Sequence, residues 1–274
     1  MAGALFKQEE FSEVYHKHMI EISPEVLALM LNYVENKVGN TSNLLAVDIG
    51  CGTGNVTRKL APHFLEVIGL DFSESQLKIA REVTTEKNIT YHLSPSENFL
   101  LADNSVDLIN ATCAVHFFNI DKFMHEVVRV LKPGGCLALS SLFLKCEIRY
   151  KDLSEALTNI FHEALRRVCM YGSDAVDHLK SEYQTIFKAV PFTDKERFTD
   201  LPMIYPVSVK KLVGLIQATF MYQDFLMKNQ KDALLFLQNL EKSFSELGIS
   251  ELEATMELHS KSVCVLAYKP KANA

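Results

Sequence analysis

A regular alternation of short apolar segments and amphipathic segments, between residue 44 and about residue 145, constrains the fold most strongly. Short apolar runs are typical of buried strands, and apolar residues at helical spacing are typical of helices. Strands joined by helical crossovers predict a parallel sheet that helices cover on both faces. The strand segments are LLAVDIG, LEVIGLDF, ITYHLS, VDLINAT and GCLALSSLF, and the helical ones are VTRKLAPHF, ESQLKIAREV and DKFMHEVVRVL.

Helix start and stop signals agree with this reading. Ser23 followed by Pro24 is typical of a helix start, and Gly39 ends the apolar periodicity that follows. Ser73 precedes another helix, and Gln76 three residues later completes the pattern of a capping box.

The glycine-rich loop DIGCGTGN follows the first strand, where open α/β sheets bind ligands. The dinucleotide fingerprint requires a glycine at position 55, which is Asn55, and no Gly-Lys-Ser/Thr of a P-loop follows. Gly50 and Gly52 allow the backbone to approach a ligand closely. The loop therefore predicts a ligand other than a dinucleotide or a nucleoside triphosphate.

Two acids narrow the ligand further. Asp48, at the end of the first strand, repels a pyrophosphate and attracts a cation. Asp71 ends the second strand, 21 residues after Gly50, and an acid at that distance can accept hydrogen bonds from ribose hydroxyls. A ligand with a ribose and a positive charge but no phosphate fits, and S-adenosylmethionine has these features.

Five segments in this order resemble the successive motifs of class I S-adenosylmethionine-dependent methyltransferases: VDIGCGTGNVTRKLA, VIGLDFSESQLKIAR, SENFLLADNSVDLI, ATCAVHFF and EVVRVLKPGG. Together they cover about residues 44 to 143. ATCAVHFF and VSVKKLVGLIQATFMYQDFL also resemble the trans-aconitate methyltransferase-like group of small-molecule enzymes.

The resemblance implies a Rossmann-like α/β fold with a seven-stranded sheet of order 3-2-1-4-5-7-6, its last strands antiparallel. The cofactor-binding core is expected at residues 41–145. Residues 251–274, with a turn at HSKS, are expected to supply the final strands as a hairpin. Helices in residues 1–40 and 146–250 are expected to form a cap over the cofactor cleft.

The resemblance also implies roles for residues around the cofactor, whose product is S-adenosylhomocysteine. Ser96 and Glu97 are expected at the adenine edge, Phe72 on the adenine face, and Thr112 and Cys113 beside the methyl-donating centre. The full set of expected cofactor residues is Tyr15, Asp48, Gly50, Gly52, Asn55, Asp71, Phe72, Gln76, Ser96, Glu97, Thr112 and Cys113.

His116, just past the fourth strand, has three readings: a structural histidine, a residue lining the substrate pocket, or a general base. Phe117 stands where related sequences carry tryptophan, and YHKHMIEIS, from Tyr15 on, replaces their Tyr-x-x-x-Arg-Pro pattern. The absence of that arginine weakens the case for a tricarboxylate substrate. The expected substrate residues are Tyr15, His18, His116, Phe117, Met221 and Tyr222.

The chemistry of methyl transfer favours a particular nucleophile. A carboxylate is ionised at neutral pH and needs no base, whereas a hydroxyl or an amine does, and no His–Asp pair at fixed spacing is evident. The leading hypothesis is O-methylation of a carboxylate or similar group on a partly hydrophobic small molecule. The alternatives are N- or S-methylation of a small molecule, and a catalytically inactive regulatory module that binds the cofactor.

Composition bears on compartment and partners. A net charge of −6 argues against a nucleic-acid partner, and no apolar run reaches the roughly 20 residues that span a bilayer. The six cysteines show no CxxC spacing, so we expect reduced thiols in a cytoplasmic monomer or homodimer. His16 and His18, spaced i and i+2, do not make a convincing metal site, and no metal is expected.

Overall fold

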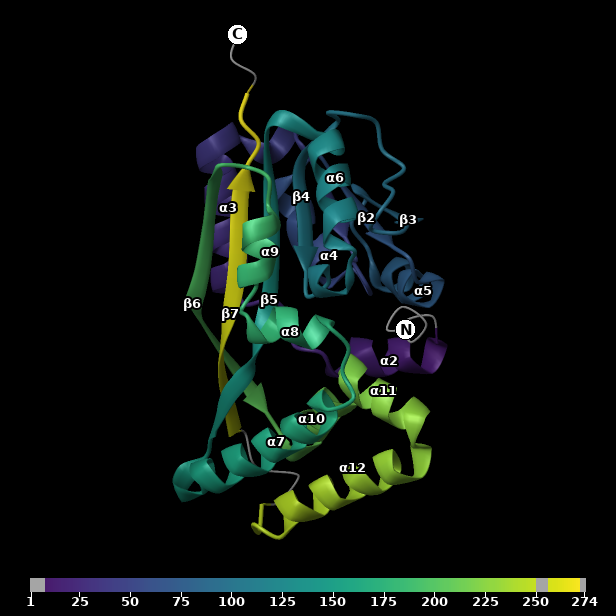
Figure 1. Cartoon of the computed structure of the whole chain (residues 1–274), viewed down its shortest axis with the longest axis vertical. Helices are drawn as coiled ribbons and strands as arrows, with labels where there is room; N and C mark the ends of the chain where they lie inside the picture. The colour runs from purple at the N-terminus through teal and green to yellow at the C-terminus, as the bar shows by residue number, and fades with distance from the viewer. Residues whose placement is uncertain (1–7, 250–255, 272–274) are drawn as a thin grey trace. The chain divides into compact units, whose positions relative to one another are not determined.

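In a computed structural model of the chain, the described residues are 8–249 and 256–271, and the side chain of Leu144 is not described. One seven-stranded sheet has the order β3-β2-β1-β4-β5-β7-β6, which confirms the expected order (Figure 1). The strands are β1 (Leu45–Ile49), β2 (Glu66–Asp71), β3 (Ile89–Leu93), β4 (Val106–Thr112), β5 (Leu131–Arg149), β6 (Asp194–Val207) and β7 (Met256–Tyr268).

The strands β1 to β5 are parallel neighbours, as the helical crossovers predicted. Chain order runs from β1 outward to β2 and β3, then returns to β4 on the other side of β1. The carboxyl ends of β1 and β4 therefore form the topological switch point of the sheet. At the other end of the sheet, Gly134 N donates to Lys269 O, and Ser260 Oγ donates to Lys145 O, so β7 runs antiparallel to β5.

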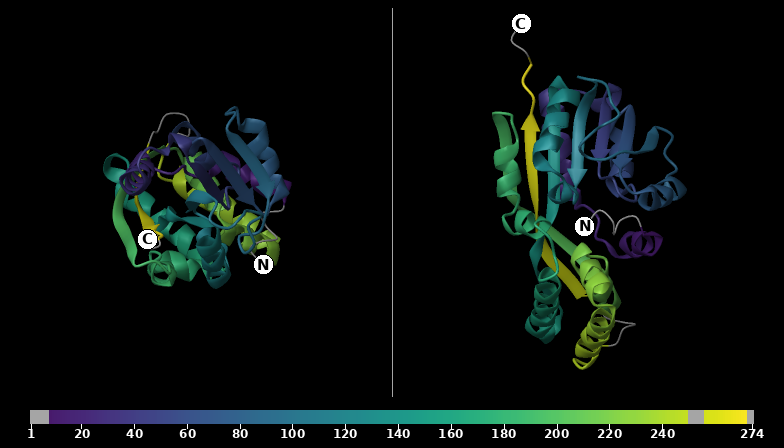
Figure 2. Two further views of the ribbon diagram at one scale, coloured as in Figure 1. Left: turned by 90° about the horizontal axis from the view of Figure 1, so that it is seen from above. Right: turned by 45° about the vertical axis from the view of Figure 1, so that its right-hand side comes forward.

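Helices separate most of the strands along the chain (Figures 1 and 2). The α-helices are α2 (Glu9–His18), α3 (Pro24–Val38), α4 (Asn55–Leu60), α5 (Glu74–Val83), α6 (Ile120–Val130), α7 (Ser154–Cys169), α8 (Ala175–Lys180), α9 (Gln184–Ala189), α10 (Val209–Gln217), α11 (Phe220–Lys228) and α12 (Gln230–Ser245). Short 3-10 turns are η1 (Thr41–Asn43), η2 (Ala61–His63), η3 (Val115–Phe117) and η4 (Lys151–Leu153).

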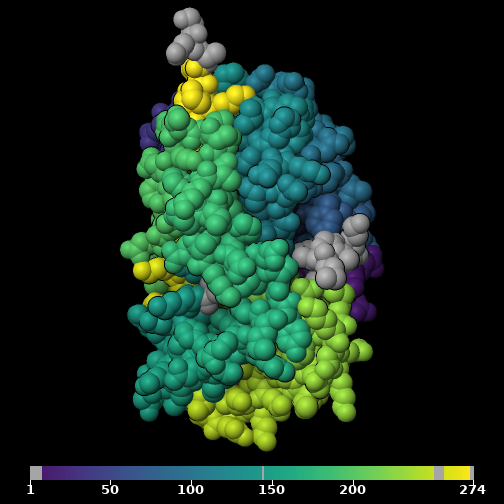
Figure 3. Space-filling view, in the orientation of Figure 1, coloured from purple at the N-terminus to yellow at the C-terminus, as the bar shows by residue number. Residues whose placement is uncertain are grey.

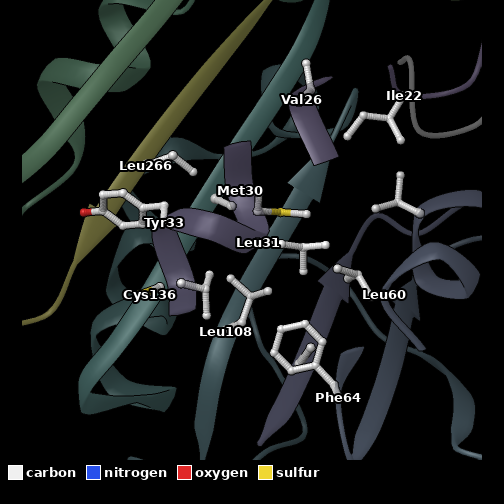
Figure 4. Packing of buried hydrophobic residues seen from close by; sticks show 14 of the residues in the cluster. Ile22, Val26, Met30, Leu31, Tyr33, Leu60, Phe64, Leu108, Cys136 and Leu266 are labelled. Atoms are coloured by element: carbon white, nitrogen blue, oxygen red, sulfur yellow. The ribbon is translucent and has the colours of Figure 1, made fainter. Parts of the chain in front are cut away.

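The main core lies between one face of the sheet and helix α3. Figure 4 shows Met30 and Leu31 of α3 among strand residues such as Leu108 and Leu266. Side chains of a strand alternate between the two faces of a sheet. The strand residues that point to the opposite face, such as Val47, are buried as well. The sheet is therefore covered on both faces, and on the near side of Figure 1 the cover includes α6 and α9.

The helix start at Ser23 is confirmed, since its side chain accepts a hydrogen bond from Val26 N. Helix α3 packs against the sheet, however, and is not part of a cap as expected for residues 1–40. The apolar face of α3 packs against the strand residues whose side chains point toward this helix. The predicted capping box at Ser73 is half formed: Ser73 Oγ accepts from Gln76 N, but the Gln76 side chain makes no return bond.

The expected C-terminal hairpin is wrong. Residues 256–268, including HSKS, form the single strand β7, while residues 251–255 lie outside the described part of the chain. The remaining strand, β6, comes from residues 194–207, inside the segment expected to be helical. As the edge strand it is mostly half-buried or exposed, which allows Pro202 and Pro206 and hides the alternating pattern.

The chain divides into two compact units whose boundaries differ from the expected ones. The first contains residues 8–20, 143–180, 202–249 and 256–261 of the described chain. The second contains residues 21–142, 181–201 and 262–271, and it includes the strands β1 to β4 with their loops. We refer to them as the helical unit and the sheet unit.

Candidate functional site

The loop after β1 carries three glycines whose φ angles are positive: +67° at Gly50, +55° at Gly52 and +77° at Gly54. Gly50 N donates to Leu70 O at 2.7 Å, which ties the loop to the end of β2. A Cβ atom on Gly50 would stand 2.6 Å from the Cβ of Ala114, closer than atoms can pack. Backbone conformation and space both therefore require glycine at this position.

Asp71 closes the loop from the side of β2. Its Oδ2 accepts from Gly52 N at 2.8 Å, and its Oδ1 accepts from Ser73 N at 2.9 Å. Burial raises the pKa of Asp71 to about 6, although the backbone hydrogen bonds act in the opposite direction. Each carboxylate oxygen can accept further bonds, so the predicted role toward a ribose is compatible with these contacts.

Asp48 is buried beneath the same loop. Its Oδ2 accepts from Thr57 Oγ1 at 2.7 Å, and its Oδ1 accepts from Asn110 Nδ2, also at 2.7 Å. Burial raises its pKa to about 6, against the two side-chain hydrogen bonds, and the nearby charge of Asp71 adds to the rise. Asp48 thus ties β1 to α4 and β4. The expected contact of Asp48 with a cationic ligand stays a prediction, because these hydrogen bonds do not test it.

The carboxyl end of β4 lies beside the middle of β5, where Thr112 pairs with Ser140. Thr112 Oγ1 and Ser140 Oγ are 2.9 Å apart, and Cys113 N donates to Ser140 O at 2.8 Å. Cys113 has a φ of +54°, a left-handed conformation that is uncommon for a side chain of this kind. Burial raises the pKa of its thiol, so Cys113 is neutral and offers no thiolate nucleophile.

His116 lies in η3, immediately after the same strand end. Its side chain is buried, and Nδ1 is 2.8 Å from the hydroxyl of Tyr183. The ring of Phe117 is 4.2 Å from the His116 ring between centroids. The sequence analysis missed Tyr183, because it lies 67 residues away in a segment with no motif that marks it.

Ser96 and Glu97 lie in the loop after β3, both half-buried. Ser96 Oγ donates to Glu97 Oε1 at 2.8 Å, and Asn119 N donates to the same oxygen at 3.1 Å. Glu97 therefore fixes this loop against the residue that caps α6. The adenine contact expected of the pair is a prediction that these hydrogen bonds leave open.

Two amides near the loop have buried atoms without a hydrogen-bond partner among the described residues. They are Oδ1 of Asn55, the first residue of α4, and both polar atoms of the Gln76 side chain. Buried polar atoms are rarely left unpaired in folded proteins. Phe72, between Asp71 and Ser73, is half-buried.

The part of the chain that carries these loops matches a family model. Residues 47–139 match the model described as "Methyltransferase domain". A protein of Dictyostelium discoideum named as a methyltransferase is 30% identical over 190 residues, which make up 69% of each chain. The chain belongs to the class I S-adenosylmethionine-dependent methyltransferases. S-adenosylmethionine is the methyl donor of this methyltransferase.

Two further comparisons agree. The ubiquinone biosynthesis O-methyltransferase of Leptothrix cholodnii is 28% identical over 143 residues, which are 48% of this chain and 61% of that protein. The solved phosphoethanolamine N-methyltransferase 2 of Haemonchus contortus, in complex with S-adenosyl-L-methionine, superposes with a TM-score of 0.56 at 20% identity. It covers 99% of this chain and 60% of that one. At that identity the likeness concerns the fold.

The residues of this methyltransferase fit the cofactor. The three positive-φ glycines leave a cradle that a Cβ atom would fill at Gly50. Asp71 stands at the rim of the cradle, and the unpaired Oδ1 of Asn55 lies in the first turn that follows it. These groups offer acceptors for a cationic ligand that bears hydroxyls, and they oppose a phosphate.

Other expected site residues belong to the helical unit. Tyr15 is half-buried in α2, and His18 in the same helix packs against Gly214 of α10. Met221 and Tyr222 are buried in α11, where the Tyr222 hydroxyl donates to Ala233 O at 3.3 Å. Their packing is that of core residues, so the structure does not favour the expected substrate contacts of Met221 and Tyr222.

All six cysteines are free thiols in the structure. Among residues 8–249 and 256–271, no three His, Cys, Asp or Glu side chains are placed to hold a metal ion. Within the same residues, no helix combines the length and apolarity needed to cross a bilayer.

Proposed function

We propose that this methyltransferase methylates a carboxylate, or a similarly acidic oxygen, on a small and partly hydrophobic molecule. One observation carries the proposal: at the switch point, Nδ1 of His116 is paired with the hydroxyl of Tyr183, a phenol. A His–carboxylate pair is the usual device for activating a hydroxyl. A carboxylate nucleophile needs no such device, because it is already ionised at neutral pH.

The work of the protein in this reaction is mainly orientation. S-adenosylmethionine, when bound, supplies an activated methyl group. The chain holds the donor through the glycine cradle and Asp71, and it must align the nucleophile and exclude water. Correct orientation can contribute about 7–11 kcal/mol of barrier reduction in model reactions. A cap made of the helical unit is part of the proposal, since closure over the site would exclude water.

The sequence relative from Leptothrix cholodnii is named for O-methylation in ubiquinone biosynthesis, which supports a small-molecule substrate and an oxygen nucleophile. Membership of the trans-aconitate methyltransferase-like group rests on the two motifs quoted above. A macromolecular substrate is disfavoured, because a net charge of −6 opposes binding to nucleic acid.

The test is a transfer assay with S-adenosylmethionine labelled in its methyl group. The full chain is incubated with the small-molecule fraction of a cell extract, and the labelled products are identified by mass spectrometry. The products are then treated with alkali. A methyl ester releases labelled methanol, whereas N-methyl, S-methyl and ether products retain the label. The Asp71→Ala variant, assayed in parallel, separates enzymatic transfer from spontaneous methylation.

Each outcome decides between the hypotheses. Alkali-labile label in a small molecule supports the proposal, and alkali-stable label shifts the reaction to N-methylation, S-methylation or ether formation. If the chain binds S-adenosylhomocysteine but labels nothing in any extract, the regulatory module gains support. Label in protein or RNA, when macromolecules are added back, would overturn the small-molecule proposal.

A further inference from the structure

Tyr183 is a buried tyrosine with an unusual position. It belongs to the sheet unit, and its side chain has 0% exposure. Its hydroxyl lies 2.8 Å from His116 Nδ1. Ser141, in the middle of β5, is buried too, and its hydroxyl donates to Cys113 Sγ at 3.9 Å. Segments far apart in sequence thus bring two polar side chains together in the interior of the protein.

The backbone leading into Tyr183 has an uncommon conformation. Glu182 and Tyr183 both have positive φ, +51° and +60°, and neither is glycine. Such conformations persist only where the surrounding structure enforces them. Arg197 Nη1 donates to Glu182 O at 2.9 Å, and α9 begins immediately after Tyr183. In the surface view the green 181–201 segment abuts the blue-green surface of α6 (Figure 3).

The chemistry of the pair assigns the protons. Burial raises the pKa of Tyr183 well above its ordinary value, so the phenol keeps its proton. A phenol is a stronger donor than an imidazole N–H, and an imidazole nitrogen is a stronger acceptor than a phenol oxygen. The hydroxyl of Tyr183 therefore donates to Nδ1. With Nδ1 occupied as an acceptor, the proton of neutral His116 lies on Nε2.

We propose that Tyr183 is a positioning residue that locks His116 in its Nε2–H tautomer, so that His116 acts as a hydrogen-bond donor and not as a general base. This inference rests on the proposed function where it places His116 beside the substrate. There the Nε2–H group suits an acceptor such as a carboxylate oxygen. It cannot remove a proton from a hydroxyl or an amine, because the basic lone pair of the ring is held by Tyr183.

Nitrogen NMR of the full chain, labelled with 15N, tests the tautomer directly at pH 7.5. The His116 signals are assigned by their loss in a His116→Asn variant. We expect a proton on Nε2 and an acceptor-type shift for Nδ1. In Tyr183→Phe the ring of residue 183 is kept and the hydroxyl is lost. The ratio of the Nε2–H to the Nδ1–H tautomer should then fall by about three- to tenfold, the effect of one hydrogen bond.

The control is Tyr33→Phe, which removes a buried phenol hydroxyl on helix α3 and should leave the His116 signals unchanged. The wild-type spectrum decides the matter even if Tyr183→Phe fails to fold. A proton on Nδ1 in the wild type overturns the proposal, as does an unchanged ratio in folded Tyr183→Phe. The spectrum needs no substrate, so an N-methylated product in the transfer assay would contradict the proposed function while leaving this result intact.

Discussion

Asp48 and Asp71 bring two carboxylates into one buried end of the sheet, and each has a pKa raised to about 6. Removing a charged carboxylate from water costs free energy that the surrounding hydrogen bonds only partly return. A chain that needed only stability would not place both there. The two raised pKa values at the switch point are therefore consistent with a functional site.

The raised pKa of Asp48 has a consequence for stability. The ordinary pKa is 3.8 and the folded value is about 6. Between these pH values the folded protein therefore keeps a proton on Asp48 that the unfolded chain has released. Below pH 3.8 the group has no effect on stability. The destabilisation grows as pH rises and is complete above about pH 6.

Asp48→Asn removes this titration. The unfolding free energy of the variant, minus that of the wild type, should therefore rise by about 2–3 kcal/mol from pH 4 to pH 7. Denaturant titrations of both proteins without cofactor, at closely spaced pH values, measure the difference. A difference that is flat or falls with pH would show that the fold does not raise the pKa of Asp48.

Gly50 offers a second test at the scale of one residue. Gly50→Ala meets both a positive φ and the Cβ of Ala114, whereas Gly39→Ala meets a positive φ with nothing within 4 Å. Backbone strain is thus common to both variants, and only Gly50→Ala adds overpacking, which costs about 1–3 kcal/mol. We expect Gly50→Ala to bind S-adenosylhomocysteine at least about tenfold more weakly, and Gly39→Ala to keep wild-type affinity. Equal affinities for the two variants would remove the loop from the cofactor site.

At the scale of elements, the pairing of α2 with α10 depends on a missing side chain. The three atoms nearest to a Cβ built on Gly214 all belong to His18, with Nδ1 at 2.0 Å. The imidazole therefore occupies the space that any larger residue would need. Burial and then the charges of Lys17, Lys211 and Lys210 lower the pKa of His18, which keeps the ring neutral in this contact.

A double-mutant cycle tests this packing. Gly214→Ala alone should lower the unfolding free energy, because the clash outweighs the helix-propensity gain of about 1 kcal/mol that alanine brings. In a His18→Ala background the clash is gone, and the same substitution should become neutral or stabilising. The change of sign, measured by denaturant unfolding, is the expected result. Additive effects in the two backgrounds would show that the helices do not meet here.

The elements also show what sequence can and cannot predict. Strands β1 and β4 were predicted because they are largely apolar and are buried on both faces of the sheet. Strand β6 was missed because an edge strand needs no such pattern. The hairpin prediction failed because HSKS resembles a turn sequence. In the structure these residues continue strand β7, and the Ser260 hydroxyl donates to Lys145 O of β5.

For the molecule as a whole, sequence motifs predicted the cofactor, whereas contacts between distant segments could be seen only in the structure. The glycines and Asp71 could be read from sequence because their spacing is fixed by one strand–loop–helix unit. Tyr183 could not, because only the folded chain brings it to His116. Tyr15 and His18 lie in the helical unit, and their role beside the substrate stays a prediction.

The central claim is that S-adenosylmethionine binds at the switch point with Asp71 as an acceptor for its ribose. Calorimetric titration with S-adenosylhomocysteine tests it most directly, on the wild type, Asp71→Asn and the exposed control Asp121→Asn. We predict that Asp71→Asn weakens binding by about 1–3 kcal/mol while Asp121→Asn leaves the affinity unchanged. Wild-type affinity in folded Asp71→Asn, or no binding by the wild type itself, would contradict the account.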